Sequence, residues 1–340
     1  MIKYGFFHLP PPMHGSAKIG ETIKNNFNLI DVLDISLMDS ISNHGSLTLS
    51  KIKKILYQIT FVLFTRFNSE KIIYIPSSKG LSLIRDFFLI FILVLKKVKV
   101  YSLYLNTKAD ESSFLLRILH KFIVKNSHVI LTSEVFISDL LGVKPKQLSI
   151  CNLGVNCPEY IITHQNLSKV VNIGFFSNWY VSKGIDDFIK IINIVNRVNN
   201  NFHFYIAGQT GDLNKNDIIT QLSRTDNVTI VGPVYNDFKF KFLSSLDLLL
   251  FPSKDDTFPL SILEAMSQGV FTISTNVGAI EEILKNPLAG ICLDGSEYIT
   301  SVIDILNSNL LVNKNQIIKE YKLRYTEKKF IDNLSKIFSK

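Results

Sequence analysis

The sequence is poor in cysteine and in the residue clusters that bind metal ions. Its 340 residues include three cysteines, Cys151, Cys157 and Cys292. These are too few and too scattered for a disulfide framework or a zinc cluster, and their scarcity favours a reducing compartment. No grouping of histidine, cysteine and aspartate has metal-ligand spacing. We therefore expect no bound metal and no resident cofactor.

Long hydrophobic runs are also missing. The most apolar stretch runs from Phe87 to Leu95, whereas a membrane-spanning helix needs about 20 residues. The apolar run before the prolines at 10–12 is too short for a secretory signal. These features predict a cytoplasmic protein and leave open peripheral contact with the inner face of the cell membrane. The 46% hydrophobic content excludes a disordered chain.

Several catalytic motifs are absent, and the positive charge is local. Without a G-x-S-x-G, P-loop or GxGxxG motif, triad hydrolases, P-loop kinases and dinucleotide oxidoreductases lose their main support. The formal net charge is +8, and residues 51–100 alone carry ten Lys/Arg against two acids, while residues 167–340 balance eighteen against eighteen. A nucleic-acid binder would more often spread its basic residues over a broad face. We expect no nucleic-acid partner.

Short apolar runs alternate with segments of helical periodicity, which predicts βαβ units and a parallel, doubly wound α/β fold. Strands are predicted over 2–7, 29–33, 72–75, 98–104, 129–132, 170–175, 202–207, 228–231, 248–251 and 270–274. Helices are predicted over 15–26, 47–66, 80–97, 111–125, 184–199, 214–223, 236–245, 259–268 and 279–285. The pattern occurs twice, so we expect two Rossmann-like domains, 1–165 and 166–312, facing a central ligand cleft. Residues 313–340 should form amphipathic helices that pack back across the domains.

The segment 251–282 combines a strand end, an acidic loop and a helix start. Asp255 and Asp256 lie in the loop, and Pro259 falls in the first helical turn, where proline fits. The free amides of that turn suit a phosphate or sugar oxygen. Asp256 and Glu264 are eight residues apart, so both can face one ligand. Taken singly, each acid would more often be a helix cap or a solvated residue.

This segment resembles the donor-binding motif of retaining glycosyltransferases of the GT-B fold, family 4, in which two glutamates are separated by seven residues. It is most similar to the bacterial polysaccharide subgroup, and the match runs Asp256-Thr257-Phe258-Pro259-Leu260, then Leu263-Glu264-Ala265-Met266 and Gly269. The resemblance implies that Asp256 contacts the donor sugar, that Glu264 binds the ribose, and that residues 257–260 form a phosphate and sugar loop. Aspartate is one methylene shorter than the usual glutamate, so the sugar contact should be weaker or differently placed.

Other segments resemble the same family. In Gly174–Asp186, Lys183 matches the lysine that neutralises the donor diphosphate, while Ser177 and Asn178 stand near the place of a usual arginine. The resemblance thus gives Lys183, Asp256 and Glu264 as the catalytic residues. It also gives donor contacts outside the acidic loop, at Gly15 in the loop after the first strand, and at Gly208, Pro233 and Val234.

Residues 51–66 have a helical pattern with two apolar sides. One side carries Ile52, Ile55, Leu56, Ile59, Val62 and Leu63, and we expect it to be buried. The other carries an aromatic ridge flanked by two lysines, which is typical of an interfacial membrane helix: Lys53, Lys54, Tyr57, Phe61 and Phe64. Packing on another subunit or on the tail helix is the alternative.

The resemblance implies a retaining glycosyltransferase that moves a sugar from a nucleotide-diphosphate sugar to a glycan or lipid-linked acceptor. Bacterial surface polysaccharide assembly at an anionic membrane surface is the expected setting. Two alternatives stay open: another GT-B enzyme, such as a sugar-nucleotide epimerase, and a catalytically silent glycosyltransferase-like partner subunit.

Overall fold

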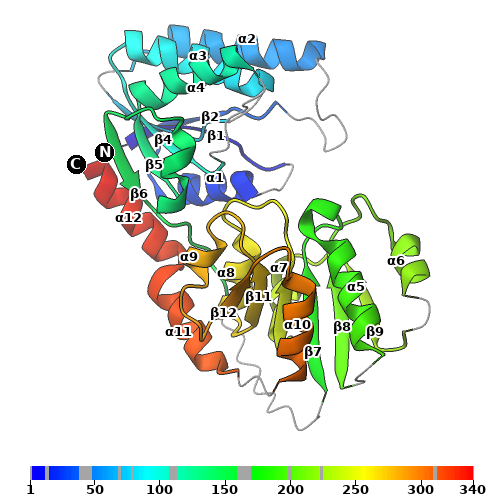
Figure 1. Cartoon of the computed structure of the whole chain (residues 1–340). Coiled ribbons are helices and arrows are strands. Elements are labelled where there is room, and N and C mark those ends of the chain that lie inside the picture. The colour runs from blue at the N-terminus through cyan, green and yellow to red at the C-terminus, as the bar shows by residue number, and fades with distance from the viewer. Residues whose placement is uncertain are drawn as a thin grey trace. The chain divides into compact units, whose positions relative to one another are not determined.

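The computed structural model describes residues 2–11, 15–37, 48–67, 70–77, 80–106, 113–158, 170–197, 201–222, 225–308 and 312–339. The chain forms two compact units (Figure 1). The N-terminal unit comprises residues 1–152 and 327–340, and the C-terminal unit comprises residues 153–326. The sequence placed the division at residue 165, inside the segment 159–169, which lies outside the described residues.

The N-terminal unit contains a six-stranded parallel sheet with the strand order β2-β1-β3-β4-β5-β6. Its strands are β1 (Ile2–Phe7), β2 (Asp31–Asp34), β3 (Lys71–Tyr74), β4 (Lys99–Tyr104), β5 (His128–Leu131) and β6 (Gln147–Ile150). Its helices are α1 (Gly15–Asn26), α2 (Leu49–Phe64), α3 (Gly80–Leu95), α4 (Phe114–Asn126) and α12 (Glu327–Ser339), with a 3-10 helix over Glu134–Leu140.

Strand order and the right-handed crossover rule place these helices in two layers. The connection through α1 runs from β1 to β2, opposite to the direction of those through α2, α3 and α4. Right-handed crossovers therefore put α1 on one face of the sheet and α2, α3 and α4 on the other (Figure 1). On the α1 side, the Glu327 carboxylate of α12 accepts hydrogen bonds from Thr22 and Asn26. The helix pairs α2–α3 and α3–α4 pack against each other.

The burial of α2 differs from the sequence prediction. The buried positions are Lys51, Gln58 and Val62, and the predicted buried stripe is wrong at three apolar positions, which are exposed: Ile52, Leu56 and Leu63. Phe61, predicted to face solvent, is half-buried, and its ring meets that of Phe6 edge to face at 6.3 Å. The helix is apolar almost all round, so periodicity alone could not choose which side meets the sheet.

The C-terminal unit contains a second six-stranded parallel sheet, with the order β12-β11-β10-β7-β8-β9. Its strands are β7 (Val171–Phe176), β8 (Phe202–Ala207), β9 (Val228–Gly232), β10 (Leu248–Phe251), β11 (Phe271–Thr275) and β12 (Gly290–Leu293). Its helices are α5 (Ile185–Val195), α6 (Lys215–Gln221), α7 (Asn236–Ser244), α8 (Leu260–Ser267), α9 (Ile280–Ile283), α10 (Tyr298–Asn307) and α11 (Lys314–Arg324).

The core of the C-terminal unit lies between its sheet and the flanking helices. Strand β10 is fully buried, and α8 and α11 pack together, as do α5 and α10. Within the tail, α11 belongs to the C-terminal unit and α12 to the N-terminal one. Of the twelve strands in the described residues, the sequence predicted ten and missed β6 and β12, which are four residues each. It also missed α10.

Candidate functional site

The C-terminal unit carries its candidate site at the topological switch point of its sheet. Strands β7 and β10 are neighbours, and the chain leaves them in opposite directions, toward β8 and toward β11. The loops that follow two such strands diverge and leave space for a ligand at the carboxyl edge of the sheet. The loop after β7 contains Ser177 and Asn178 and leads into a 3-10 helix over Val181–Lys183, which ends at Lys183. The loop after β10 contains Asp255, Asp256 and Thr257.

Lys183 and Asp256 join these two loops. The Lys183 Nζ lies 2.8 Å from the Asp256 Oδ2 and also donates to the Asp255 carbonyl oxygen at 2.6 Å. The side chains of Lys183 and Asp256 are 27% and 20% exposed. Because both side chains are partly exposed, a ligand can reach them. The structure thus brings together the predicted cation and the predicted carboxylate.

Backbone contacts hold the loop after β10 in place. Gly278 has a left-handed backbone, with φ +57°, and a Cβ there would collide with the carbonyl oxygens of Asp256 and Thr257. Gly184 is left-handed as well, with φ +80°, and packs in the same way against the Pro252 carbonyl oxygen. Only glycine combines this backbone with such a close approach.

Lys254, in the same loop, is fixed on α5. Its Nζ lies 2.9 Å from Asp186 and 3.0 Å from Asp187. Burial alone would raise the pKa of Asp187, but hydrogen bonds from Lys190 and Lys254 outweigh it and lower that pKa. Lys254 therefore anchors the loop, which leaves Lys183 as the cation paired with Asp256.

A second ion pair lies between α7 and α8. The Lys239 Nζ donates to the Glu264 Oε1 at 2.7 Å, and the side chains are 16% and 7% exposed. Glu264 sits on the second turn of α8, and α7 packs beside this helix. Burying a carboxylate to this extent is costly unless a cation or hydrogen bonds compensate for the lost water. Lys239 supplies that cation.

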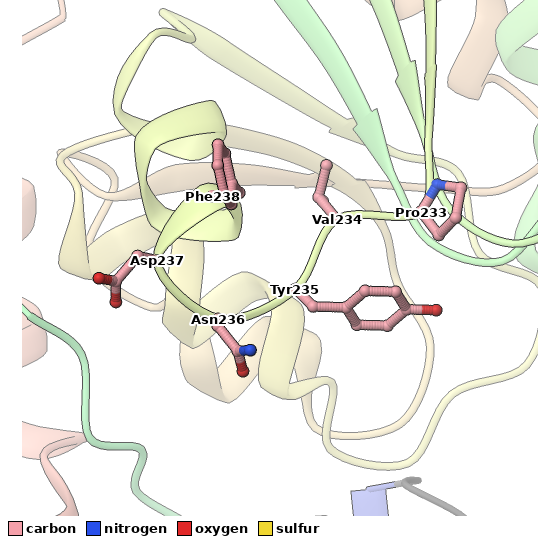
Figure 2. Close-up of a pocket in the computed structure, with 6 residues that line it drawn as sticks. All are labelled: Pro233, Val234, Tyr235, Asn236, Asp237 and Phe238. Atoms are coloured by element: carbon pink, nitrogen blue, oxygen red, sulfur yellow. The ribbon is translucent and has the colours of Figure 1, made fainter.

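A pocket of about 540 Å³ opens at the start of α7. Its lining runs from Pro233 to Phe238, and Figure 2 shows the Tyr235 side chain pointing away from Asp237. Tyr235 and Phe238 are 54% and 75% exposed. Asn236 has φ +49°, a left-handed conformation that asparagine tolerates better than most residues. Exposed rings at a pocket rim offer stacking surfaces to a planar ligand.

Hydrogen bonds connect this pocket to the loop after β7. The Gly208 amide donates to the Gly232 carbonyl oxygen at 2.9 Å. The Gln209 amide donates to the Asn178 Oδ1 at 3.3 Å, and its side chain donates to the Tyr235 hydroxyl. These contacts link the loop after β7 to the loop after β8, and the loop after β8 to the loop after β9. The three loops carry the predicted donor-binding positions Ser177, Asn178, Gly208, Pro233 and Val234.

Other predicted residues take different places. Phe258 is buried against the Tyr325 ring, at a centroid distance of 6.4 Å, so its side chain is not available to a ligand. Pro259 is the N-cap of α8, and the helix begins at Leu260 rather than at 259. Gly15 is the first residue of α1 in the N-terminal unit, where an added Cβ would meet open space.

Sequence reasoning missed Lys239, Tyr235 and Gln209. The segment Asp237–Phe242 alternates lysine with phenylalanine, so nothing in it separates Lys239, which reaches Glu264, from Lys241, which lies over the Phe238 ring. The available sequence signal for Lys239 was its position, about one helical turn after the start of the helix that follows the G-x-V loop.

The residues that the structure describes contain neither a metal-binding cluster nor a membrane-spanning helix. There, no group of three or more histidine, cysteine, aspartate or glutamate side chains is placed to hold a metal ion. Within those same segments, none of the helices is long and apolar enough to cross a membrane.

The match to a known family lies within the C-terminal unit. Residues 170–308 match the family model described as Glycosyl transferases group 1. An uncharacterized glycosyltransferase of Methanocaldococcus jannaschii is 33% identical over 112 residues, which cover 32% of this chain and 28% of that protein. The chain spans 27–40% of the length of the curated relatives that it matches.

Solved structures resemble the whole chain. HepE of Anabaena, in complex with UDP and glucose, aligns with a TM-score of 0.69 and 12% identity over 100% of both chains. The lipopolysaccharide outer core galactosyltransferase WaaB, in its apo form, aligns with a TM-score of 0.73 and 13% identity over 100% of this chain and 99% of its own. The predicted fold is confirmed: the two Rossmann-like domains match those of GT-B glycosyltransferases.

Proposed function

We propose that this protein is a retaining glycosyltransferase that takes its sugar from a nucleotide-diphosphate sugar. The observation that carries the proposal is the partly exposed Lys183–Asp256 pair, at 2.8 Å, at the switch point of the C-terminal sheet. A diphosphate needs a cation, and a sugar hydroxyl needs an acceptor such as a carboxylate. The match of residues 170–308 to the group 1 family supports the same assignment.

In the proposed reaction, the bond between the anomeric carbon and the diphosphate oxygen breaks. Negative charge then builds up on the leaving diphosphate. Lys183 and the backbone amides at the start of α8 stabilise that charge. The acceptor hydroxyl attacks from the face that the diphosphate leaves, so the anomeric configuration is kept. Its proton leaves with the diphosphate or with water.

Glu264 binds the ribose in this proposal, and Lys239 is a positioning residue that orients the Glu264 carboxylate. The base lies in the pocket over 233–238, where Tyr235 and Phe238 offer rings for stacking. By the family resemblance, Gly15 of the N-terminal unit is a further donor-binding candidate. The nucleotide sugar is a substrate, and the proposed site requires no resident cofactor or metal.

The proposed acceptor is a glycan or a lipid-linked glycan, assembled into a bacterial surface polysaccharide on the cytoplasmic face of the membrane. The likeness to a lipopolysaccharide outer core galactosyltransferase supports an acceptor of this class. The likeness to a protein solved with UDP and glucose makes UDP-sugars the first donors to try.

A thermal-shift panel of UDP-, GDP-, ADP- and CMP-sugars tests donor binding. We expect a rise in melting temperature with one nucleotide class, and Glu264→Gln should weaken donor affinity about tenfold, because the ribose loses a charged acceptor. Glu297→Gln is the matched control, since Glu297 is exposed and makes no side-chain cap hydrogen bond at the start of α10. A flat response to all four classes would contradict the proposal.

Turnover is measured separately, as nucleoside diphosphate released in the presence of membrane extract. The wild-type protein should release it, and NMR of the product should show the anomeric configuration of the donor. Donor binding without release would instead favour the catalytically silent partner subunit.

A further inference from the structure

The outer side of α2, α3 and α4 exposes large apolar side chains over three neighbouring helices. On α2, Leu49, Ile52 and Leu56 follow a spacing of three and four residues and are 68%, 38% and 56% exposed. Tyr57 and Phe64, two helical turns apart, are 64% and 83% exposed. That spacing makes one continuous stripe along the helix. The stripe is exposed even though α12, the tail helix, is present in the same unit, so the tail does not cover it.

The neighbouring helices continue this surface. Phe88 and Leu95 of α3 are 47% and 66% exposed, and Phe114 and Leu115 of α4 are 81% and 58% exposed. Phe87 of α3 and Phe122 of α4 pack edge to face, with ring centroids 4.9 Å apart. The three helices lie side by side, α2 on α3 and α3 on α4 (Figure 1). Their exposed apolar side chains together make up one apolar surface, here called the outer face. A surface of this kind marks an interaction site.

The charge around the outer face has a single sign. Residues 48–67, 80–97 and 113–126 contain one acidic residue, Asp86, and it is fully buried beside Arg85. The exposed basic side chains on α2, at its end and on α4 are Lys53, Arg66, Arg117, Lys121 and Lys125. A protein partner would more often be matched by charges of both signs, whereas an anionic lipid surface requires apolar anchors within a basic rim.

We propose that the outer face docks this protein on an anionic lipid bilayer. The apolar side chains of the three helices enter the boundary between headgroups and acyl chains, and the basic rim contacts the anionic headgroups. Lys96 is not part of this rim, because it donates to the Leu63 and Thr65 carbonyl oxygens and so closes the end of α2. Docking through the outer face does not require glycosyltransferase activity.

Sedimentation with vesicles tests the proposal. Full-length protein should pellet with phosphatidylcholine vesicles that contain phosphatidylglycerol, pellet less with phosphatidylcholine alone, and be released by salt. The double variant Phe64→Ser/Phe114→Ser should lower the partition coefficient at least about tenfold, because it removes two apolar anchors. Leu323→Ser on α11, which is 62% exposed and outside the outer face, should pellet like the wild type.

A charge series separates the two parts of the surface. Lys53→Glu and Lys121→Glu should each lower the partition coefficient about fivefold or more at low salt. Lys285→Glu, an exposed lysine of the C-terminal unit, is the control. Unchanged melting temperatures of all variants confirm that they are folded.

Two results would overturn membrane docking. One is a sedimentation result: either the wild-type protein stays in the supernatant with phosphatidylglycerol vesicles, or the double variant pellets as fully as the wild type. The other is a wild-type dimer in solution that Phe64→Ser/Phe114→Ser converts to a monomer, without vesicle binding by either form. That second result would assign the outer face to an interface between two copies of this chain.

Discussion

Two ion pairs, one in each domain, differ sharply in burial. In the N-terminal unit, Arg85 and Asp86 on α3 meet at 2.6 Å, and both side chains are fully buried. In the C-terminal unit, Lys183 and Asp256 meet at 2.8 Å with roughly a quarter of each side chain exposed. The two distances are nearly equal. The accessibility to solvent and ligand is what differs.

Neighbouring groups form hydrogen bonds with both members of the buried pair. Asp86 accepts hydrogen bonds from the Tyr74 hydroxyl at 2.6 Å and from the Ser77 amide at 2.6 Å. Arg85 also donates to the Ile35 carbonyl oxygen. These contacts join the segments that follow β2 and β3, so this pair holds the backbone of the two segments together. The Lys183–Asp256 pair has an open side, which is what a binding site needs.

The comparison is tested first by Asp86→Ala, for which we expect the largest effect. The free energy of unfolding of the N-terminal unit should fall by about 3–5 kcal/mol, because Arg85 would be left as an uncompensated buried charge. Urea titration followed by circular dichroism measures the loss. Lys183→Ala, which breaks the exposed pair, should change that free energy by less than about 1 kcal/mol. Equal effects of the two variants would contradict the distinction between the pairs.

Lys183→Ala should act on activity instead. Turnover should drop about tenfold or more, because the leaving diphosphate loses its cation. Release of nucleoside diphosphate from a saturating donor measures it. Lys190→Ala serves as the control, since Lys190 is an exposed cation that pairs with Asp187 on α5. A Lys183→Ala enzyme with wild-type turnover would remove Lys183 from the proposed mechanism.

Lys239→Met should have a smaller effect, mainly on donor binding. The donor KM should rise several-fold with little change in kcat, because Glu264 loses the partner that orients it. Lys241→Met is matched in chemistry and helix, and we expect it to bind donor normally. Lys239→Arg should restore affinity. A loss that arginine cannot rescue, or one that Lys241→Met shares, would indicate a general effect on α7 packing.

The smallest effect is expected from Asp256→Glu. The longer carboxylate still reaches Lys183, so turnover should stay within about threefold of the wild type. Asp256→Asn removes the charge and should lower turnover further. Steady-state kinetics with the preferred donor distinguishes the two. If Asp256→Glu proved as damaging as Asp256→Asn, the side-chain length at 256 would be essential rather than a tolerated variation.

Regular patterning made most of the fold predictable. Strands such as β10 are continuous apolar runs buried on both faces, and α5 or α8 begin beside turn residues, so their type and approximate bounds follow from local sequence. The acidic loop and Lys183 were predictable because loop, helix start and spacing are local features. The pairing of Lys239 with Glu264 was not predictable, since it depends on how α7 packs beside α8.

The burial of the N-terminal helices marks the same limit. For α2 the sequence determined a helix that is apolar on most sides, with lysines near its start. It could not determine that Phe61 turns toward Phe6 while Leu56 and Leu63 stay exposed. That choice depends on the helix's rotation against the sheet and on α3, which is fixed by contacts between residues distant in sequence. Local pattern determined what each segment is, and tertiary packing decided which side chains it presents.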